Sequence, residues 1–142
     1  MTKRLTTSVL ATAALLAGLL AGGAPAAVSA PYPGSVGTDA NTSVPDTVQD
    51  GSRAHITVRV SADGSARALA GAKPKGTVKV TVRRNAGGYS FSDSAGYHGG
   101  KVVFTTGKLT KNGKYSVSVR FVPKEGSVYK GSHDTDSFRV VG

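Results

Sequence analysis

Histidine, aspartate and glutamate are the residues of this chain that could hold a metal ion, and their spacing gives no strong metal site. The three histidines are His55, His98 and His133. The first lies near the start of an alternating segment and the other two lie in loop-like segments, so no pair has the spacing typical of a zinc site. His133 with Asp134 and Asp136 could hold a cation weakly, but polar loop residues are usually solvated. We therefore predict no metal site.

Serine and carboxylate residues also lack the arrangement that catalysis requires. No serine occupies the glycine-flanked G-x-S-x-G elbow that exposes a nucleophile. Glutamate occurs only at Glu125 and the aspartates fall in turn-like segments, so no catalytic carboxylate pair is evident. The pairs Gly87-Gly88 and Gly99-Gly100 flank predicted strands and lack the lysine of a phosphate-binding loop. The sequence predicts a protein that is not an enzyme and binds no cofactor.

Lysine and arginine are the side chains best placed to bind a ligand. They number 18 against 8 aspartates and glutamates, for a formal net charge of +10 at pH 7. From Pro31 to Ala72 acidic residues slightly outnumber basic ones, so the excess beyond the first thirty residues lies between Lys73 and Gly142. Such asymmetry can mark an anion-binding surface, and it also serves solubility.

The segments that must position these cations alternate apolar and polar residues with a period of two, which is typical of half-buried β-strands. A short edge strand with valines 44 and 48 is also expected, because Pro45 cannot donate to an interior ladder. About seven short strands predict an all-β sandwich, and periodicity leaves a closed barrel open as the alternative. The clearest alternation covers residues 54–60, 76–83 and 115–121, and weaker alternation covers 89–91, 101–106 and 138–140.

Residues 1–30 have the three parts of a secretory signal peptide. Two basic residues precede an apolar block at residues 9–20, and small residues follow, with cleavage expected after Ala26 or Ala30. The block is shorter than the roughly 20 apolar residues that cross a bilayer, so no membrane span is predicted. We expect an extracellular protein, released or associated non-covalently with the cell wall.

The rest of the chain divides into a leader and one domain. Residues 31–41 combine proline, glycine and small polar residues without periodicity, which predicts a flexible leader. Residues 42–142 are enough for one small domain with a single hydrophobic core. Because the chain has no cysteine, apolar packing and hydrogen bonds must stabilise this domain.

The alternating segments together resemble a bacterial immunoglobulin-like repeat domain over most of residues 51–140. The resemblance rests on DGSRAHITVRV, PKGTVKVTV, GGKVVFTTGKL and NGKYSVSVRFVPKEGSVYKGS as the second, third, fifth and sixth strands, the last with its following loop. Its most specific part is Leu109 ahead of Gly113-Lys114-Tyr115, followed by Tyr129-Lys130-Gly131-Ser132. The resemblance implies an immunoglobulin-like two-sheet antiparallel β-sandwich, with spacer or adhesion roles in larger proteins. This chain departs from the pattern by carrying one copy and a glycine-containing insertion at residues 85–100.

The resemblance gives an interpretation of the residues at the start of the sixth strand. Tyr115 lies two residues before Val117, where immunoglobulin domains often carry a cysteine, so Tyr115 is a candidate corner tyrosine bonded back to the backbone. Asn112-Gly113 is a strong hairpin signal. The implied fold instead sends the chain to the other sheet there, and we follow the fold because Leu109 needs a buried corner.

In such a sandwich the third, sixth and seventh strands share a sheet, so their outward residues meet. Lys79 should approach Arg120 across the antiparallel third and sixth strands, and like charges directly opposite each other destabilise a sheet by a few tenths of a kcal/mol. An anionic partner would relieve this repulsion. The candidate anion-binding face comprises Lys79, Arg83, Arg120 and Arg139, and its neighbouring outward positions carry no acidic residue. The alternative is a solvated face whose charges discourage edge aggregation.

The predicted function is a secreted bacterial binding or structural accessory module that contacts an anionic cell-wall polymer, or another extracellular protein, through this face. Nucleic acid is a weaker candidate because no outward aromatic residue is evident for base stacking, and the absence of tryptophan disfavours a carbohydrate ring stack. Tyr97 is a possible ligand contact in a loop, whereas Tyr129 is assigned a structural role. The alternative function is a small secreted inhibitor or ligand carrier that uses the loop at residues 85–100. The oligomeric state does not follow from the sequence.

Overall fold

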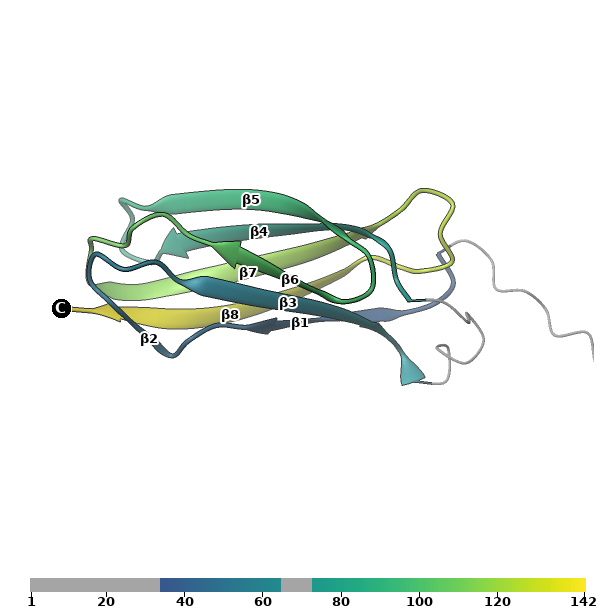
Figure 1. Ribbon diagram of the computed structural model, residues 1–142, viewed down its shortest axis with the longest axis horizontal. Coiled ribbons are helices and arrows are strands. Elements are labelled where there is room, and N and C mark those ends of the chain that lie inside the picture. The colour runs from purple at the N-terminus through teal and green to yellow at the C-terminus, as the bar shows by residue number, and fades with distance from the viewer. Residues whose placement is uncertain (1–33, 65–72) are drawn as a thin grey trace, which may run out of the picture.

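The computed structural model describes residues 34–64 and 73–142, and in these residues eight β-strands form two sheets (Figure 1). The predicted signal peptide at residues 1–30 lies outside the described residues. So do residues 31–33 of the predicted leader. The strands are β1 (Thr38–Ser43), β2 (Thr47–Gln49), β3 (His55–Ala62), β4 (Gly76–Arg84), β5 (Ser90–Tyr97), β6 (Lys101–Thr105), β7 (Gly113–Pro123) and β8 (Ser132–Val141).

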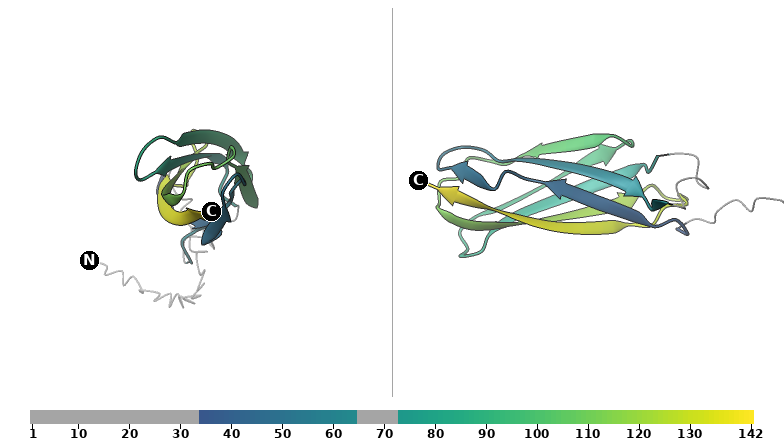
Figure 2. Two further views of the ribbon diagram at one scale, coloured as in Figure 1. Left: turned by 90° about the vertical axis from the view of Figure 1, so that its left-hand side faces the viewer. Right: turned by 90° about the horizontal axis from the view of Figure 1, so that it is seen from below.

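The two sheets pack face to face around one main core (Figure 2). One has three strands in the order β1-β3-β6, and the other has five in the order β2-β8-β7-β4-β5. The predicted third, sixth and seventh strands are β4, β7 and β8, and they lie in the same sheet, as in an immunoglobulin-like sandwich. The predicted all-β sandwich is confirmed, and the described strands do not close into a single barrel.

Alternation along the central strands explains why the sheets pack as they do. On β7, Tyr115, Val117, Val119 and Phe121 are buried and the residues between them are exposed. On β4, valines 78, 80 and 82 are buried in the same way. Each strand therefore gives one apolar face to the core and one polar face to solvent.

The N-terminal strand is divided between the sheets. β1 pairs antiparallel with β3, residues 44–46 with Pro45 cross to the other sheet, and β2 then pairs in parallel with β8. The predicted edge strand with valines 44 and 48 is therefore wrong in its extent, since only Val48 lies in a strand. The flexible leader predicted for residues 31–41 is also wrong over Thr38–Asn41, and the domain begins before residue 42. The small side chains of β1 concealed its alternation.

The crossing between β6 and β7 follows the predicted fold and forms no hairpin at Asn112-Gly113. Leu109 is fully buried, and its backbone exchanges hydrogen bonds with Gly51 and Ser52. The Tyr115 hydroxyl donates to the carbonyl oxygen of Lys111 at 2.7 Å, which is the predicted tyrosine corner. Burial raises the pKa of this hydroxyl above its ordinary value, although the charge of Arg84 acts in the opposite direction.

The insertion at residues 85–100 is mostly a strand. The weak alternation at residues 89–91 marked only its start, and the loop assigned to the rest is wrong over residues 92–97. Ser90–Tyr97 form β5, which pairs antiparallel with β4 along its whole length and lies at the edge of the five-stranded sheet. An edge strand has a neighbour on one side only and needs few apolar residues. The polar residues of β5 are therefore typical of an edge strand and of a loop alike. Tyr97, expected as an exposed loop contact, is buried.

No helix in residues 34–64 and 73–142 has both the length and the apolar character needed to cross a bilayer.

Candidate anion-binding face

The four residues of the candidate face all project from the outer side of the five-stranded sheet. Lys79 and Arg83 lie on β4, Arg120 lies on β7 and Arg139 lies on β8. All four are exposed, and each is preceded or followed on its strand by buried core residues. The alternation that builds the core therefore also fixes the direction of these cations.

The register between the strands places the two central cations directly opposite each other. Lys79 is the antiparallel partner of Arg120, as predicted from the sequence. Arg83 faces Ser116, so this arginine has a hydroxyl and not a cation across the ladder. Side chains directly opposite on antiparallel strands have their Cβ atoms about 4.5–5.5 Å apart, so Lys79 and Arg120 repel each other.

Two further basic residues belong to the face and were missed in the sequence. His133 is the partner of Arg120 on its other side, and Lys114 is the partner of Arg139. Lys114 could have been found by extending the alternation of β7 by one step from Ser116. His133 could not, because the start of β8 has no apolar alternation to mark it.

The residues around His133, considered from the sequence as a weak cation site and set aside, do not lie on one side of the sheet. His133 is exposed on the outer face, whereas Asp134 and Asp136 alternate to the other side of β8. Asp134 Oδ2 accepts a hydrogen bond from the backbone N–H of Thr42 at 2.7 Å, which ties β8 to β1. Because these residues lie in a strand and not in a loop, alternation places the histidine and the two aspartates on opposite sides of the sheet.

The outer side of the five-stranded sheet carries no carboxylate at the register positions of its described strands. Besides its cations it carries mainly small hydroxyl residues, and Thr81 and Ser92 lie within hydrogen-bond distance of each other at 3.2 Å. The nearest acidic residue along the ladder is Asp93, which alternates to the other side and faces Val80. Among residues 34–64 and 73–142 no basic side chain of this face forms an ion pair. The hydroxyl positions are Ser90, Ser92, Ser94, Thr77, Thr81, Ser116, Ser118, Thr135, Ser137 and Thr47.

An open depression of ≈ 660 Å³ lies on this face between β7 and β8. Its lining includes Arg120, His133, Ser118 and Val122. Val122 is 39% exposed, which is unusual for a large apolar residue in this sheet. The depression can therefore admit a ligand that meets the charge of Arg120 and a small apolar surface together.

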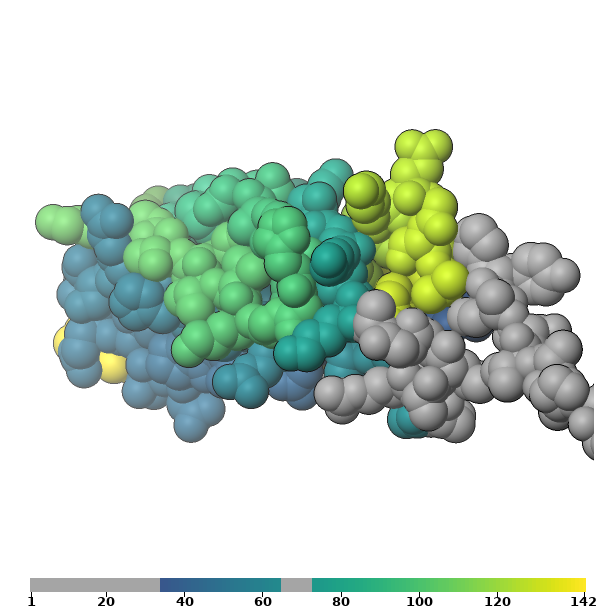
Figure 3. Space-filling model, turned by 45° about the vertical axis from the view of Figure 1, so that its right-hand side comes forward, coloured from purple at the N-terminus to yellow at the C-terminus, as the bar shows by residue number. Residues whose placement is uncertain are grey.

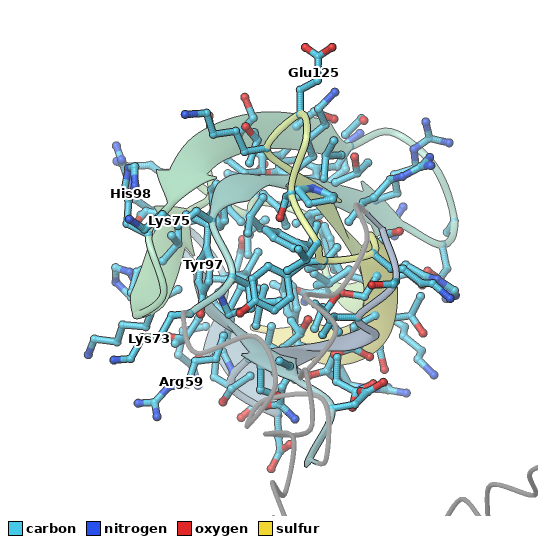
Figure 4. All side chains as sticks on the ribbon, turned by 90° about the vertical axis from the view of Figure 1, so that its right-hand side faces the viewer. Arg59, Lys73, Lys75, Tyr97, His98 and Glu125 are labelled. Carbon is cyan, nitrogen blue, oxygen red and sulfur yellow. The ribbon has the colours of Figure 1, made fainter. Side chains whose placement is uncertain are left out.

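The basic character continues at the end of the sandwich. The backbone N–H of Lys124 donates to the carbonyl of Lys75 at 3.0 Å, which extends the ladder between β4 and β7 by one step. Both lysines line a second depression of ≈ 550 Å³ together with His98. Glu125 also lines this depression, so one carboxylate lies beside the two lysines. Viewed from this end, Lys75 and His98 lie at one side and the Glu125 side chain points outward at the top (Figure 4). The segment between β7 and β8 that carries Glu125 stands out from the surface (Figure 3).

The region that the alternative function would use has a different form. Tyr97 reaches from β5 across the core to the three-stranded sheet, where its hydroxyl accepts from the N–H of Val60 at 2.8 Å. The same hydroxyl lies 2.9 Å from the Val60 carbonyl and 2.7 Å from the Gly100 carbonyl. A depression of ≈ 400 Å³ beside it has both polar and apolar lining, including Arg59 and Lys73. The loop that a ligand carrier would need at residues 85–100 is replaced by a strand.

No protein-family model matches this chain, and no curated protein matches its sequence. Among solved structures, it is similar to a β-glucosidase from Listeria innocua, crystallised with isofagomine, with a TM-score of 0.46 and 16% sequence identity over 75% of this chain. The matched part is 16% of that enzyme's chain. It is also similar to the CARDB domain of a protein from Pyrococcus furiosus, solved in complex with di-metal ions, with a TM-score of 0.42 and 19% identity over 81% of this chain and 97% of that one.

Proposed function

We propose that this protein is a secreted, non-enzymatic immunoglobulin-like module that binds an anionic cell-wall polymer through the outer side of its five-stranded sheet. The observation that carries the proposal is the placement of Lys79 directly opposite Arg120, with His133 as the next partner in the same row. The signal peptide predicted at residues 1–30 supports an extracellular location. An anionic ligand would neutralise a repulsion that the sheet otherwise retains.

The chemistry of the face suits an anion that is bound at the surface. Arginine presents a planar group of donors that matches phosphate or carboxylate oxygens, and lysine acts as a point charge beside it. The hydroxyl residues between the cations can donate further hydrogen bonds to the same ligand. The outer positions carry no aromatic side chain in the described strands, which disfavours a ligand held by stacking.

The other sheet does not offer the same surface. Arg59 on β3 faces Lys101 on β6, which is another pair of opposed cations. However, Asp39 on β1 lies on that outer face as the partner of Ser61, one step along from Arg59. The Asp39 carboxylate therefore partly neutralises the charge of Arg59 and Lys101, whereas no described strand of the five-stranded sheet places a carboxylate on its outer side to do so.

Binding to purified cell-wall fractions should depend steeply on salt. With several cations contacting the polymer, we expect affinity to fall about tenfold to hundredfold between about 50 and 200 mM salt, because released counterions and screening both favour dissociation. Co-sedimentation with walls at the two salt concentrations measures this. Walls stripped of their anionic polymer provide the control. Equal binding at both salt concentrations, or undiminished binding to stripped walls, would contradict the proposal.

A further inference from the structure

The cations along the ladder between β4 and β7 recur at a fixed interval. We define three rows: an end row of Lys75 and Lys124, a central row of Lys79 and Arg120, and an Arg83 row in which Arg83 faces Ser116. Lys75, which directly precedes β4, and Lys79 and Arg83 on β4 are four positions apart in sequence. Because a strand rises about 3.3 Å per residue, successive rows lie about 13 Å apart and the three rows span about 27 Å.

The pairs between the rows are neutral and small. Thr77 faces Val122 between the end row and the central row, and Thr81 faces Ser118 between the central row and the Arg83 row. These side chains leave a low strip along the sheet with cations at intervals and hydroxyl groups between them. Only a long ligand can use all the rows at once.

A ligand lying across the strands would contact fewer cations. Through the central row it meets Ser94, Lys79, Arg120 and His133, and then reaches the margin of the sheet at β8. Neighbouring strands are about 4.8 Å apart, so the three side chains from Lys79 to His133 on this path span only about 10 Å. The lengthwise path therefore collects more cations, and it also passes the depressions beside Arg120 and Lys75.

We infer that the ligand is an acyclic polyol-phosphate polymer of the cell wall that lies lengthwise along β4 and β7 and contacts the three rows at once. This inference rests on the proposed function and specifies the form of its ligand. A ring-bearing polymer would need an aromatic platform, whereas a thin acyclic chain can approach the threonine and serine positions between the rows. Phosphate groups spaced along such a chain can occupy the rows while the hydroxyls of the polymer contact the strip.

The test is a length series of glycerol phosphate oligomers at low salt, measured by calorimetry. Successive phosphates lie about 7 Å apart along single bonds of about 1.5 Å, so the end phosphates of a tetramer are about 21 Å apart and those of a dimer about 7 Å apart. The flexible lysine side chains of the end row let a tetramer reach all three rows, whereas a dimer reaches two at most. We expect affinity to rise about a hundredfold from dimer to tetramer, because each added row binds at a high effective concentration. From tetramer to octamer it should rise only a few-fold. Equal affinity of dimer and tetramer would overturn the lengthwise contact.

Substitution of the end row separates this inference from the proposed function. The variant Lys75→Ser with Lys124→Ser should weaken the tetramer about tenfold and leave the dimer nearly unchanged, because the dimer still has the central row. The variant Arg59→Ser with Lys101→Ser removes the same charge from the other sheet and should change tetramer affinity by no more than about twofold. Both pairs are exposed, and melting curves verify that the variants fold.

The remaining outcomes are distinct. Salt-dependent binding to walls without any length dependence of the oligomers would overturn this inference and leave the proposed function standing. Failure to bind walls and oligomers alike would remove both. A single-stranded thymidine oligonucleotide with the same charge as the octamer tests nucleic acid as the ligand. If it bound more tightly than the octamer, the inference that the ligand is an acyclic polymer would be overturned.

Discussion

Replacing Lys79 and Arg120 together by serine is expected to weaken binding to the anionic wall polymer about tenfold to hundredfold at low salt. The two residues are direct partners at the centre of the face, so their loss removes both cations of the central row. The plot of log affinity against log salt should become shallower by about one to two, since each cation contributes slightly less than one to such a slope. Co-sedimentation with purified walls over a salt series measures both effects.

The same variant should not destabilise the domain, because both side chains are exposed and repel each other. A gain of a few tenths of a kcal/mol is the expected direction. The matched control, Arg59→Ser with Lys101→Ser, removes an opposed pair of cations from the other sheet. If the control weakened wall binding as much as the central variant, the effect would come from net charge and the assignment to this face would be wrong.

Replacing Tyr97 by phenylalanine is expected to lower the free energy of unfolding by about 2–3 kcal/mol. The hydroxyl of Tyr97 serves the backbone N–H and carbonyl of Val60, and this part of β3 lies beyond the end of its pairing with β6. The variant leaves both backbone groups buried without that partner, and an unsatisfied buried group costs about 1–3 kcal/mol. For a domain of this size the melting temperature should fall by about 10 °C.

The matched control for this prediction is Tyr115→Phe, which removes another buried tyrosine hydroxyl. Within the described residues that hydroxyl makes one hydrogen bond, to the carbonyl of the exposed residue Lys111, so a loss of only about 1 kcal/mol is expected. Thermal or urea unfolding of both variants gives the comparison. Equal losses would contradict the prediction, because they would mean that the Tyr97 hydroxyl contributes no more than the hydrogen bond of the Tyr115 hydroxyl.

The elements predicted most clearly from the sequence are β3, β4 and β7, which have neighbours on both sides. β4 and β7 lie inside the five-stranded sheet, so their inward positions must be apolar at every second residue. β1 and β5 lie at sheet edges, where small or polar residues suffice. Most of β1 was assigned to a flexible leader, and only the start of β5 showed weak alternation. Edge strands take their structure from a neighbour's backbone, and that information is not in their own side chains.

The same distinction applies to the site. The opposition of Lys79 and Arg120 followed from the fold and the alternation alone. His133 could be assigned to the face only from the register between β7 and β8. The end row could be found only because the pairing of β4 with β7 continues one residue before β4, to Lys75 and Lys124. Register depends on turn geometry and on packing over the whole sheet, so single-strand patterns could not give it.

The parallel pairing of β2 with β8 determines how the domain would carry tension. The backbone N–H of Arg139 donates to Asp46, that of Asp50 donates to Val141, and an isolated parallel bridge joins Val36 to Tyr129. In parallel strands, a force that pulls the N-terminal segment and the end of β8 apart runs along both strands in opposite directions. It therefore loads these hydrogen bonds together in shear instead of opening them one after another. The crossing at Pro45 brings β2 to the last residues of β8, so this parallel pair forms a mechanical clamp at that end of the sandwich.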